Sequence, residues 1–571
     1  MGKNSISSIL EEIGTLLELK GENPFKSRAY YNAARTAELL GEEELLRLAR
    51  EDKLKEVKGI GEALSEKLKE LLLTGNMEYY EELKASIPFG LLEMLKIPGL
   101  GPRKVKSLYD TLQITTVGEL EYACRENRLV NLKGFGAKTQ ENLLKGIDFL
   151  RRSQGLYYFS EARQIGEELF EMIKDLPELV EFSLAGSIRR SREIVKDINL
   201  VACTGSPGRF TRFFTELPLI SEVLEQGETR AAVELQEGIR TQVVAVGIEQ
   251  YPYALHYFTG SREHNAAIRK HAERLGLEIN ENGLFKGKEL VRCRDEVELF
   301  SSLNLEYIPP ELRENSGEIE AAQRGELPEL VKQDDIKGIF HVHTSYSDGT
   351  NSLRELLNFT REAGYEYIGI ADHSQSAYYA GGLKEEDIKK QQEEIEELRE
   401  EYPDIGIYSG IESDIKSDGS LDYPDRILKR FDFVIASVHS ALKMSSEKMT
   451  ERLVRALSHP LVTMLGHPTG RLLLGREESP LDMERIFQVS YENNVIMELN
   501  ASPARLDLDW RYLKRAGELG LLISINPDAH RMEEISYTNY GVAIARKGWL
   551  SKEYIFNTRS RYEVNDYLNT Y

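Results

Sequence analysis

The stretch "GIFHVHTSYSDGT" (residues 338–350) ends an apolar run with two histidines, His341 and His343, and a nearby Asp348. In a β-strand, residues i and i+2 face the same side, so the two imidazoles would point at one place. Six further apolar runs follow, and each of them ends in polar residues: "YIGIADH", "IGIYSGIES", "DFVIASVH", "VTMLGHP", "NVIMELNAS" and "LISINPDAH". Seven strands that alternate with helices predict a parallel sheet, most simply closed into a barrel.

Potential metal ligands gather at the carboxyl ends of these predicted strands. The imidazoles and carboxylates found there are those of His341, His343, Asp348, His373, Glu412, His439, His467, Asp528 and His530. Active sites of α/β barrels are built at that rim. Nine donors exceed what one tetrahedral zinc ion needs, so we expect two or three divalent ions of the Mn, Zn or Fe type. A single strand-end histidine is more often structural, and His459, which lies off the pattern, is assigned to that class.

A second strand, "EIVKDINLVA" (193–202), follows "GSIRRSR" (186–192) and places Asp197 and Asn199 on one face. Two carboxylates at this spacing would hold a pair of Mg²⁺ ions for nucleotidyl transfer. The second residue is a neutral amide, which is a poorer ligand for a hard cation.

The first 150 residues have a helical pattern and contain a threefold repeat. Its copies are "VKGIGEALSEKLKELL" (57–72), "IPGLGPRKVKSLYDTL" (97–112) and "LKGFGAKTQENLLKGI" (132–147). Each is a helix-hairpin-helix signature, in which two glycines permit a tight turn whose N–H groups face a phosphate backbone. One copy alone is explained equally well as a helix cap, but three copies favour DNA binding. The glycines are Gly59, Gly61, Gly99, Gly101, Gly134 and Gly136.

Composition is compatible with these assignments. A chain of 571 residues with 41% hydrophobic and 29% charged residues predicts several soluble domains. No apolar run is long enough for a membrane span, and the first twenty residues lack the apolar core of a secretion signal. The three cysteines, Cys124, Cys203 and Cys293, are scattered, which fits a reducing cytoplasm. The net charge is −22, yet residues 1–150 carry 22 Lys and Arg against 24 Asp and Glu, so DNA binding is expected there.

The C-terminal motifs "HVHTSYSDGT", "ADHS", "GIES", "SVHS", "GHP" and "DAH" resemble those of the PHP (polymerase and histidinol phosphatase) domain. The resemblance implies a distorted barrel with three metals, and all nine metal-binding positions of that family are filled. It implies one ion held by His341, His343, Glu412 and Asp528, with Glu412 bridging to a second ion held by His439. The cluster would be completed by Asp348, His373, His467 and His530. By the same resemblance Glu412, His373 and Asp348 are also catalytic.

The upstream half resembles the bacterial and archaeal family X DNA polymerases. The motifs "GSIRRSREIVKDINLVA", "YFTGSREHNAAIR", "INENGLF" and "YIPPELRENSGEIEAA" occur in the order of that family. The resemblance implies that Gly186, Ser187 and Arg190 grip nucleotide phosphates. It also implies contacts with the sugar and base from Tyr257, Phe258, Gly260 and Asn265.

The predicted palm departs from that family at its metal positions. Of the three expected carboxylates only Asp197 is present, because Asn199 and, by ungapped alignment, Gln242 occupy the others. Lys196 also replaces a small glycine. These changes put Mg²⁺ in doubt there and predict a palm that has lost polymerisation but can still dock a nucleotide or a DNA end. Lys67 aligns with the Schiff-base lysine of family members with lyase activity, although a solvated helix face is the commoner explanation.

The predicted fold is therefore multidomain: an all-α helix-hairpin-helix region, an α+β nucleotidyltransferase palm and thumb, and an α/β distorted (βα)7 PHP barrel. The expected boundaries are 1–80 and 81–150 (helix-hairpin-helix), 151–250 (palm), 251–320 (thumb), 321–335 (linker) and 336–571 (PHP). We expect a monomeric DNA repair protein, a metal-dependent 3′–5′ exonuclease or processor of abasic sites and 3′ ends on gapped, nicked or abasic-site DNA. The alternatives are a gap-filling polymerase, a quiet DNA-binding scaffold and a small-molecule phosphatase.

Overall fold

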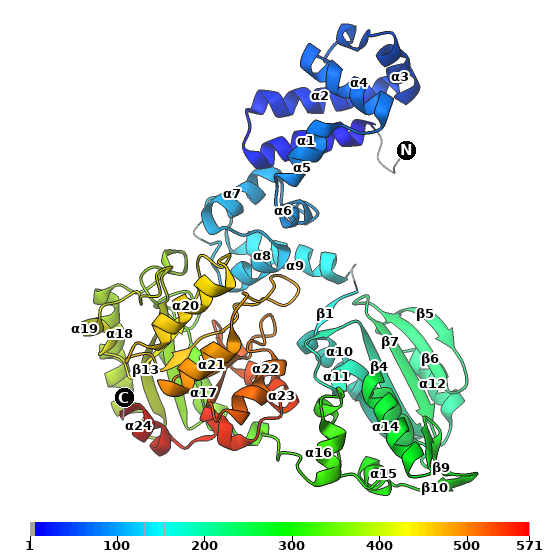
Figure 1. Ribbon diagram of the computed structural model, residues 1–571, viewed down its shortest axis with the longest axis vertical. Coiled ribbons are helices and arrows are strands. Elements are labelled where there is room, and N and C mark those ends of the chain that lie inside the picture. Colours follow the sequence, from blue (N-terminus) through cyan, green and yellow to red (C-terminus); the bar gives the residue numbers. More distant parts are fainter. Residues whose placement is uncertain (1–5, 131, 153–154, 177, 570–571) are drawn as a thin grey trace. The chain divides into compact units, whose positions relative to one another are not determined.

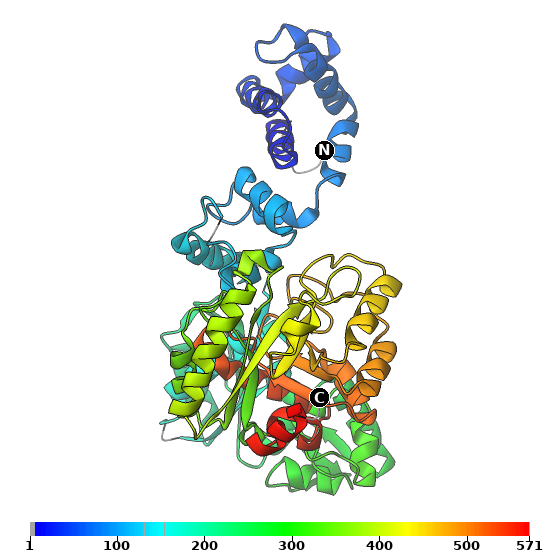
Figure 2. The ribbon, with the colours of Figure 1, turned by 90° about the vertical axis from the view of Figure 1, so that its left-hand side faces the viewer.

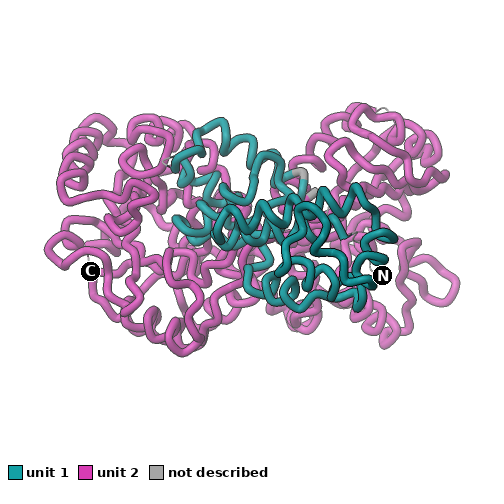
Figure 3. Tube along the Cα trace, turned by 90° about the horizontal axis from the view of Figure 1, so that it is seen from above, with its two compact units in different colours: residues 1–150 teal, residues 151–571 magenta. Residues whose placement is uncertain are grey.

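The computed structural model describes residues 6–130, 132–152, 155–176 and 178–569. They form two compact units, residues 1–150 and 151–571, coloured teal and magenta in Figure 3. Among the described residues, no helix is both long enough and apolar enough to cross a membrane.

The first unit is entirely helical, as the sequence predicts (Figure 1). Its apolar stripes pack into one core that includes Leu10, Leu17, Leu68 and Leu108, all essentially excluded from solvent. The helices are α1 (Ile6–Lys20), α2 (Pro24–Leu40), α3 (Glu42–Arg50), α4 (Glu62–Thr74), α5 (Glu78–Ala85), α6 (Phe89–Met94), α7 (Pro102–Leu112), α8 (Val117–Arg125) and α9 (Ala137–Arg152).

The second unit begins with a five-stranded mixed sheet of order β2-β4-β7-β6-β5. Strands β4 and β7 are parallel, and the other neighbours are antiparallel. The strands are β2 (Leu179–Ala185), β4 (Asp197–Thr204), β5 (Ile220–Gln226), β6 (Arg230–Leu235) and β7 (Arg240–Val246); β1 (Tyr157–Tyr158) and β3 (Ile194–Val195) form a separate pair. The accompanying helices are α10 (Phe159–Ile173), α11 (Gly186–Arg189) and α12 (Pro207–Thr215).

A smaller region of helices and a three-stranded antiparallel sheet follows, built around Ile268, Leu299 and Phe300. It comprises α13 (Tyr251–Thr259), α14 (Arg262–Arg274), β8 (Glu278–Asn280), β9 (Gly283–Lys286), β10 (Glu289–Val291), α15 (Glu296–Ser302) and α16 (Glu318–Arg324). Helix α16 runs across the boundary between residues 320 and 321, where the sequence predicted the start of the linker. Its first turn is fixed by Glu318, a buried carboxylate that accepts hydrogen bonds from the N–H groups of Asn315 and Ser316.

The last region is a seven-stranded sheet whose neighbours follow chain order and are all parallel, with helices on its outside (Figure 2). Its two edges approach each other, because Val342 pairs in parallel with Ala529 just beyond the seventh strand. The sheet is therefore a nearly closed barrel, and the fold class predicted from the sequence is confirmed. The strands are β11 (Gly338–Val342), β12 (Tyr367–His373), β13 (Gly406–Asp414), β14 (Phe433–Ser437), β15 (Met464–Leu465), β16 (Ile496–Asn500) and β17 (Ile523–Asn526).

The barrel strands are buried on both faces, and the helices between them carry ordinary end signals. Helix α17, for example, starts with a capping box in which Ser352 and Glu355 satisfy each other's backbone N–H groups. The helices are α17 (Leu353–Glu362), α18 (Glu385–Glu401), α19 (Asp425–Leu428), α20 (Ser446–Leu457), α21 (Met483–Glu492), α22 (Trp510–Glu518), α23 (Thr538–Lys547) and α24 (Arg561–Asn569).

Candidate metal centre and nucleic-acid interfaces

The carboxyl ends of the barrel strands bring all nine predicted ligands together, and their side chains are buried. Three overlapping sets have ligand atoms within 4.8 Å of one another. These sets are His343, Asp348, His373 and His530; His341, His343 and Asp528; and His373, Glu412 and His439. Because His343 and His373 each belong to two sets, the sets form one continuous cluster.

Glu412 lies at the centre of this cluster. Its Oε1 is 3.1 Å from Nε2 of His467, 3.2 Å from Nε2 of His439 and 3.3 Å from Nε2 of His341. Its Oε2 is 2.7 Å from Nδ1 of His373. A carboxylate with both oxygens directed at different imidazoles is suited to bridging two cations. The division of ligands among ions remains a prediction.

The backbone departs from regular strand geometry at three of the nine positions. His341, His467 and Asp528 have φ values of 59°, 25° and 52°, in the left-handed region that non-glycine residues seldom adopt. The β11–β12 register shifts between Ile339 and Val342, around His341. Strand alternation predicted that His341 and His343 meet, and in the structure a kinked strand brings them together. Such strain is typical of functional sites.

Two carboxylates that the sequence argument missed hold the cluster histidines in place. Glu498 is fully buried; its Oε1 is 2.6 Å from His341 Nδ1, and its Oε2 accepts the N–H of His467. Asp414 does the same for Nδ1 of His439. These bonds leave the Nε2 atoms of His341 and His439 directed at Glu412. Asp414 was detectable, since it lies two residues after Glu412 on β13.

The charges of the cluster favour cation binding. Although burial would raise the pKa of Glu412, the charges of His439 and His373 hold this pKa well below its usual range. Burial, reinforced by His530 and His373, lowers the pKa of His343 to about 4. Burial opposes charge on His439 too, but Glu412 and Asp414 raise its pKa to about 10. Glu412 therefore remains ionised. The histidines differ from one another: the pKa of His343 is lowered, whereas that of His439 is raised.

The donors fit a multinuclear centre. Six imidazoles and three carboxylates are the ligand types of Mn, Fe and Zn sites, and their nitrogen content is unsuited to Mg²⁺ or Ca²⁺. Nδ1 of His343 makes no hydrogen bond within the described chain although it is buried, and it lies 3.7 Å from Oδ1 of Asp348. Metal-bound histidines usually donate their other ring N–H to a carboxylate or carbonyl, and Glu498 and Asp414 are placed to accept from Nδ1 of His341 and His439.

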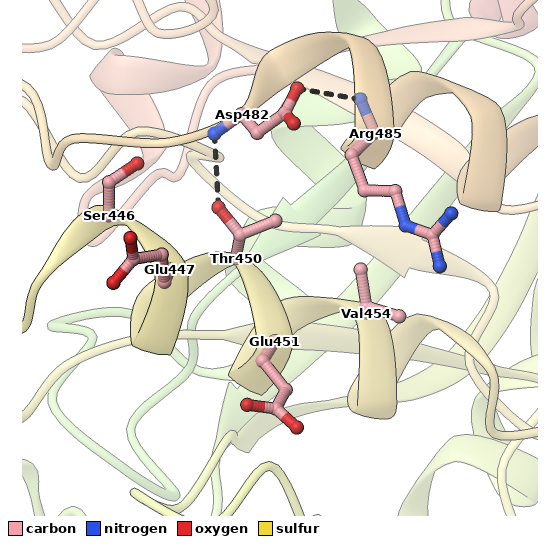
Figure 4. Close-up of a pocket in the computed structure, with 7 residues that line it drawn as sticks. All are labelled: Ser446, Glu447, Thr450, Glu451, Val454, Asp482 and Arg485. Carbon is pink, nitrogen blue, oxygen red and sulfur yellow. Dashed lines mark hydrogen bonds between the residues drawn. The ribbon is translucent and has the colours of Figure 1, made fainter.

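A surface groove between α20 and α21 is a different feature (Figure 4). Asp482 accepts a hydrogen bond from the backbone N–H of Arg485, and its own N–H donates to Oγ1 of Thr450. None of the nine cluster residues lines this groove. Its polar groups stabilise the start of α21.

The predicted palm residues also meet. Asp197 and Asn199 alternate with buried residues on β4, and Gln242 is the register partner of Asn199 on β7. The Asn199 amide donates to Oδ1 of Asp197 over 3.1 Å. Asp197, the one carboxylate at the three expected metal positions, is thus hydrogen-bonded to the Asn199 amide, which stands in place of a second acid. Lys196 is exposed.

The predicted nucleotide-binding residues gather near that strand. Gly186 has a φ of 60°, and a Cβ on it would lie 2.9 Å from Nδ2 of Asn199. Arg190 donates to the carbonyl oxygen of Thr259 and, over 3.1 Å, to Glu314. A Cβ on Gly260 would meet the Arg190 guanidinium at 3.1 Å. The remaining predicted residues are Ser187 on α11, Tyr257 and Phe258 on α13, whose rings are 5.2 Å apart, and Asn265 on α14, which donates to the Tyr257 carbonyl.

The three glycine turns of the first unit share one geometry. Gly59, Gly99 and Gly134 have φ values of 99°, 82° and 92°. The apolar residue after each first glycine is buried, and its N–H bonds to the carbonyl three residues earlier. A Cβ on Gly61, Gly101 or Gly136 would meet nothing within 4 Å. Each turn is therefore anchored on its inner side and open above its second glycine, at the start of α4, α7 or α9.

Lys67 is not on a freely solvated face. Its Nζ is 3.1 Å from the centroid of the Tyr79 ring and donates to the Tyr30 hydroxyl over 3.3 Å. Burial, and then the charge of Lys26, lowers the pKa of Lys67. Lys67 therefore differs from an ordinary solvated surface lysine in both its contacts and its pKa.

Four family models match the chain. They are a helix-hairpin-helix domain (residues 1–77), a SAM-like helix-hairpin-helix tandem (91–148), the DNA polymerase beta thumb (254–314) and the PHP domain (340–502). The thumb match covers Tyr257, Phe258, Gly260 and Asn265, and the PHP match covers seven of the nine cluster residues.

Curated relatives match the chain over different lengths. The DNA polymerase/3′-5′ exonuclease PolX of Bacillus subtilis (strain 168) is 36% identical over 572 residues, covering 100% of this chain and 99% of the relative. A probable phosphatase of Thermoanaerobacter sp. (strain X514) is 26% identical over 239 residues, 38% of this chain and 89% of its own. A probable phosphatase of Acetivibrio thermocellus is 29% identical over 170 residues, 28% of this chain and 63% of its own. The first of these relatives extends over both units, and the two phosphatases over less than half of the chain.

Proposed function

The chain belongs to the family X DNA polymerases that carry a C-terminal PHP domain, and from this premise we propose that it is a metal-dependent DNA 3′–5′ exonuclease acting in repair. The observation that carries the proposal is the buried cluster of six histidines and three carboxylates at the strand ends. The full-length relative bears an exonuclease activity in its name, which supports this direction of digestion. Gapped, nicked and abasic-site DNA are the proposed substrates.

The residues divide the work of phosphodiester hydrolysis. When bound, two or three divalent transition-metal ions would supply Lewis acidity, which activates water for in-line attack and neutralises phosphate charge. Glu412, His373 and Asp348 would hold these ions next to the scissile bond. Glu498 and Asp414 fix the tautomers of His341 and His439. Mn, Zn and Fe suit the imidazole-rich donor set, and we propose them in that role.

The upstream regions would present the DNA. The three glycine turns offer helix N-termini to the phosphate backbone, a contact that needs no base sequence. The palm would dock a nucleotide or a 3′ end, with Arg190, Tyr257 and Asn265 near it. We further propose that the palm no longer polymerises, because Asn199 and Gln242 replace two metal-binding acids and Asn199 already binds the third. The three cysteines of the chain are buried free thiols, which supports a cytoplasmic location.

The decisive experiment offers the protein Mn²⁺, a primed template and all four dNTPs. We expect primer shortening without extension. His343→Ala should abolish shortening, since it removes a ligand shared by two sets, whereas Asp197→Ala should leave it nearly intact. His459→Ala, outside the cluster, is the matched control. Template-directed extension by the unmodified protein that vanishes in Asp197→Ala would overturn the proposal and favour a gap-filling polymerase.

A second candidate activity, abasic-site lyase, is favoured by the contacts of Lys67. Its lowered pKa makes the neutral, nucleophilic amine more abundant near neutral pH, and the amine can form a Schiff base with the sugar aldehyde. Borohydride should then trap the protein on DNA with an incised abasic site. Lys67→Ala should lose the adduct. Lys69→Ala, on the same helix as Lys67, removes an ion pair with Asp52 and should keep the adduct. Equal trapping in both variants would exclude Lys67.

A further inference from the structure

The loop of residues 375–382 leaves the barrel directly after the cluster residue His373. Its ends are held together, because Ser374 and Leu383 form a parallel β-bridge. The return is tight: a Cβ on Gly382 would lie 1.9 Å from the Ser374 carbonyl oxygen. The loop is therefore a closed projection from the carboxyl end of β12, on the same side of the barrel as the metal centre.

The base of this loop is tied to groups that support the cluster. Ser376 donates its hydroxyl to Asp414 over 2.7 Å, and Asp414 in turn binds Nδ1 of His439. The Ser376 N–H donates to Asp422, and the hydroxyl of Tyr423 accepts the N–H of Gln375. These bonds fix the loop relative to the ligands.

The tip of the loop presents an aromatic ring to solvent. Tyr378 is 72% exposed, whereas its neighbours Ala377 and Ala380 are buried and anchor the short 3-10 turn. The ring of Tyr379 stands edge-on to it, with centroids 5.8 Å apart and planes at 76°. A Cβ on Gly381 would lie 3.4 Å from the carbonyl oxygen of Ser347, the residue before Asp348. The loop thus follows the cluster residue His373 in the chain and returns past the neighbour of a second cluster residue, Asp348.

We propose that Tyr378 stacks against the base of the nucleotide whose phosphodiester enters the metal centre. The proposal rests on the proposed nuclease function and adds a positioning residue to it. A nucleobase is attached one sugar away from the scissile phosphate, so a ring at the rim of the centre is within its reach. Stacking is tolerant of sequence because every base has a π-face, which suits an enzyme that digests DNA of any sequence.

Binding and hydrolysis test the proposal separately. The binding probe is a single strand with 2-aminopurine at its 3′ end and a slowly cleaved phosphorothioate as its last linkage, mixed with Mn²⁺ and the protein in which all nine cluster residues are intact. Its fluorescence should be quenched when Tyr378 is present, quenched equally by Tyr378→Phe and left bright by Tyr378→Ala. Bright fluorescence with Tyr378 in place, or equal quenching by the alanine variant, would overturn the stacking role.

In the hydrolysis test, Tyr378→Ala should raise KM for a base-containing 3′ end about five- to hundredfold and change kcat little. An oligonucleotide whose last residue lacks its base should be digested equally by both proteins. Tyr562→Ala is the matched control: Tyr562 is also 72% exposed, but α24 lies at the amino ends of the strands, where Arg561 contacts Gly406. Equal KM values for the two proteins on base-containing DNA would reject stacking and leave the nuclease standing. Failure of the unmodified protein to digest DNA would instead reject the nuclease.

Discussion

At the scale of single residues, Glu498 shows how the cluster is arranged beyond its ligands. The carboxylate is buried, with its Oε1 2.6 Å from His341 Nδ1 and accepting from the Asn526 amide over 2.9 Å. A histidine that donates from Nδ1 presents Nε2 as a lone pair, which is the form a metal requires. Burial of Glu498 is offset chiefly by the charge of His341, which holds the Glu498 pKa below its usual range.

We predict that Glu498→Gln weakens metal binding about 10- to 100-fold, the usual effect of losing such a partner. The amide keeps the size of the side chain but loses its charge and can present a donor to His341. Competition with a fluorescent chelator measures the affinity. The exposed residue Glu492 supplies the control Glu492→Gln, and an unchanged affinity in Glu498→Gln would mean that His341 needs no orienting carboxylate.

The sequence was sufficient to predict the nine cluster residues but not their partners. Ligands such as His341 and Asp528 stand at the carboxyl ends of predicted strands, and this position in the sequence pattern reveals them. Glu498 belongs to a continuous apolar strand, and nothing local separates it from an ordinary strand glutamate. Glu498 reaches His341 because β16 lies beside β17, and the chain just beyond β17 pairs with β11 where the barrel closes. This arrangement exists only in the folded chain.

At the scale of elements, the helix-hairpin-helix turns separate two roles of glycine. Gly99 adopts a positive φ, so a β-branched residue there strains the backbone. Gly101 has a φ of −84°, is the N-cap of α7 and has open space around it. The repeat in the sequence predicted three similar turns. It did not show that the first glycine of each pair adopts the positive φ and that the second leaves the helix N-terminus open to a ligand.

We predict that Gly101→Val keeps the stability of the protein but weakens DNA binding severalfold, because the side chain occupies the approach to the helix N-terminus. Gly99→Val should lower the free energy of unfolding by about 1–2 kcal/mol, since a left-handed conformation is costly for an L-residue. Thermal unfolding and fluorescence anisotropy with nicked DNA measure the two effects. Gly205→Val, which also has open space around it, is the control. Equal loss of binding in all three variants would show that the turns are not the contact.

The barrel illustrates what periodicity predicts and what it misses. Seven short apolar runs separated by helices implied seven parallel strands, and the structure has them in chain order. The left-handed backbone at His341 and Asp528 was not predictable, because histidine and aspartate adopt it more often than most residues but still do so seldom. The left-handed residues lie at strand ends, where the backbone bends so that neighbouring ligand side chains point into the cluster.

At the scale of the whole molecule, the two units make separable predictions. Removal of residues 1–150 should weaken binding to gapped DNA and flatten its salt dependence, since phosphate contacts release counterions. The shortened protein should retain two to three metal ions per chain, because all nine cluster residues belong to the other unit. Elemental analysis and binding isotherms at several salt concentrations provide the measurements. An equal salt slope with and without the first unit would place the DNA contacts elsewhere.

The palm and the barrel cluster are two candidate active sites in one chain, and the palm lacks two of its expected acids. We predict that Asn199→Asp combined with Gln242→Asp restores at most weak primer extension. The two substitutions place acids on neighbouring strands beside Asp197 and remove the amide that now donates to it. Three close carboxylates repel one another, so the midpoint of thermal unfolding should fall without Mg²⁺ and recover when Mg²⁺ binds.

Extension should stay weak because Lys196 adds a positive charge next to the metals. Asn199→Ala with Gln242→Ala is the control, which should show no recovery with Mg²⁺. Extension by the double acidic variant as fast as primer shortening would show that the two amides alone silence the palm.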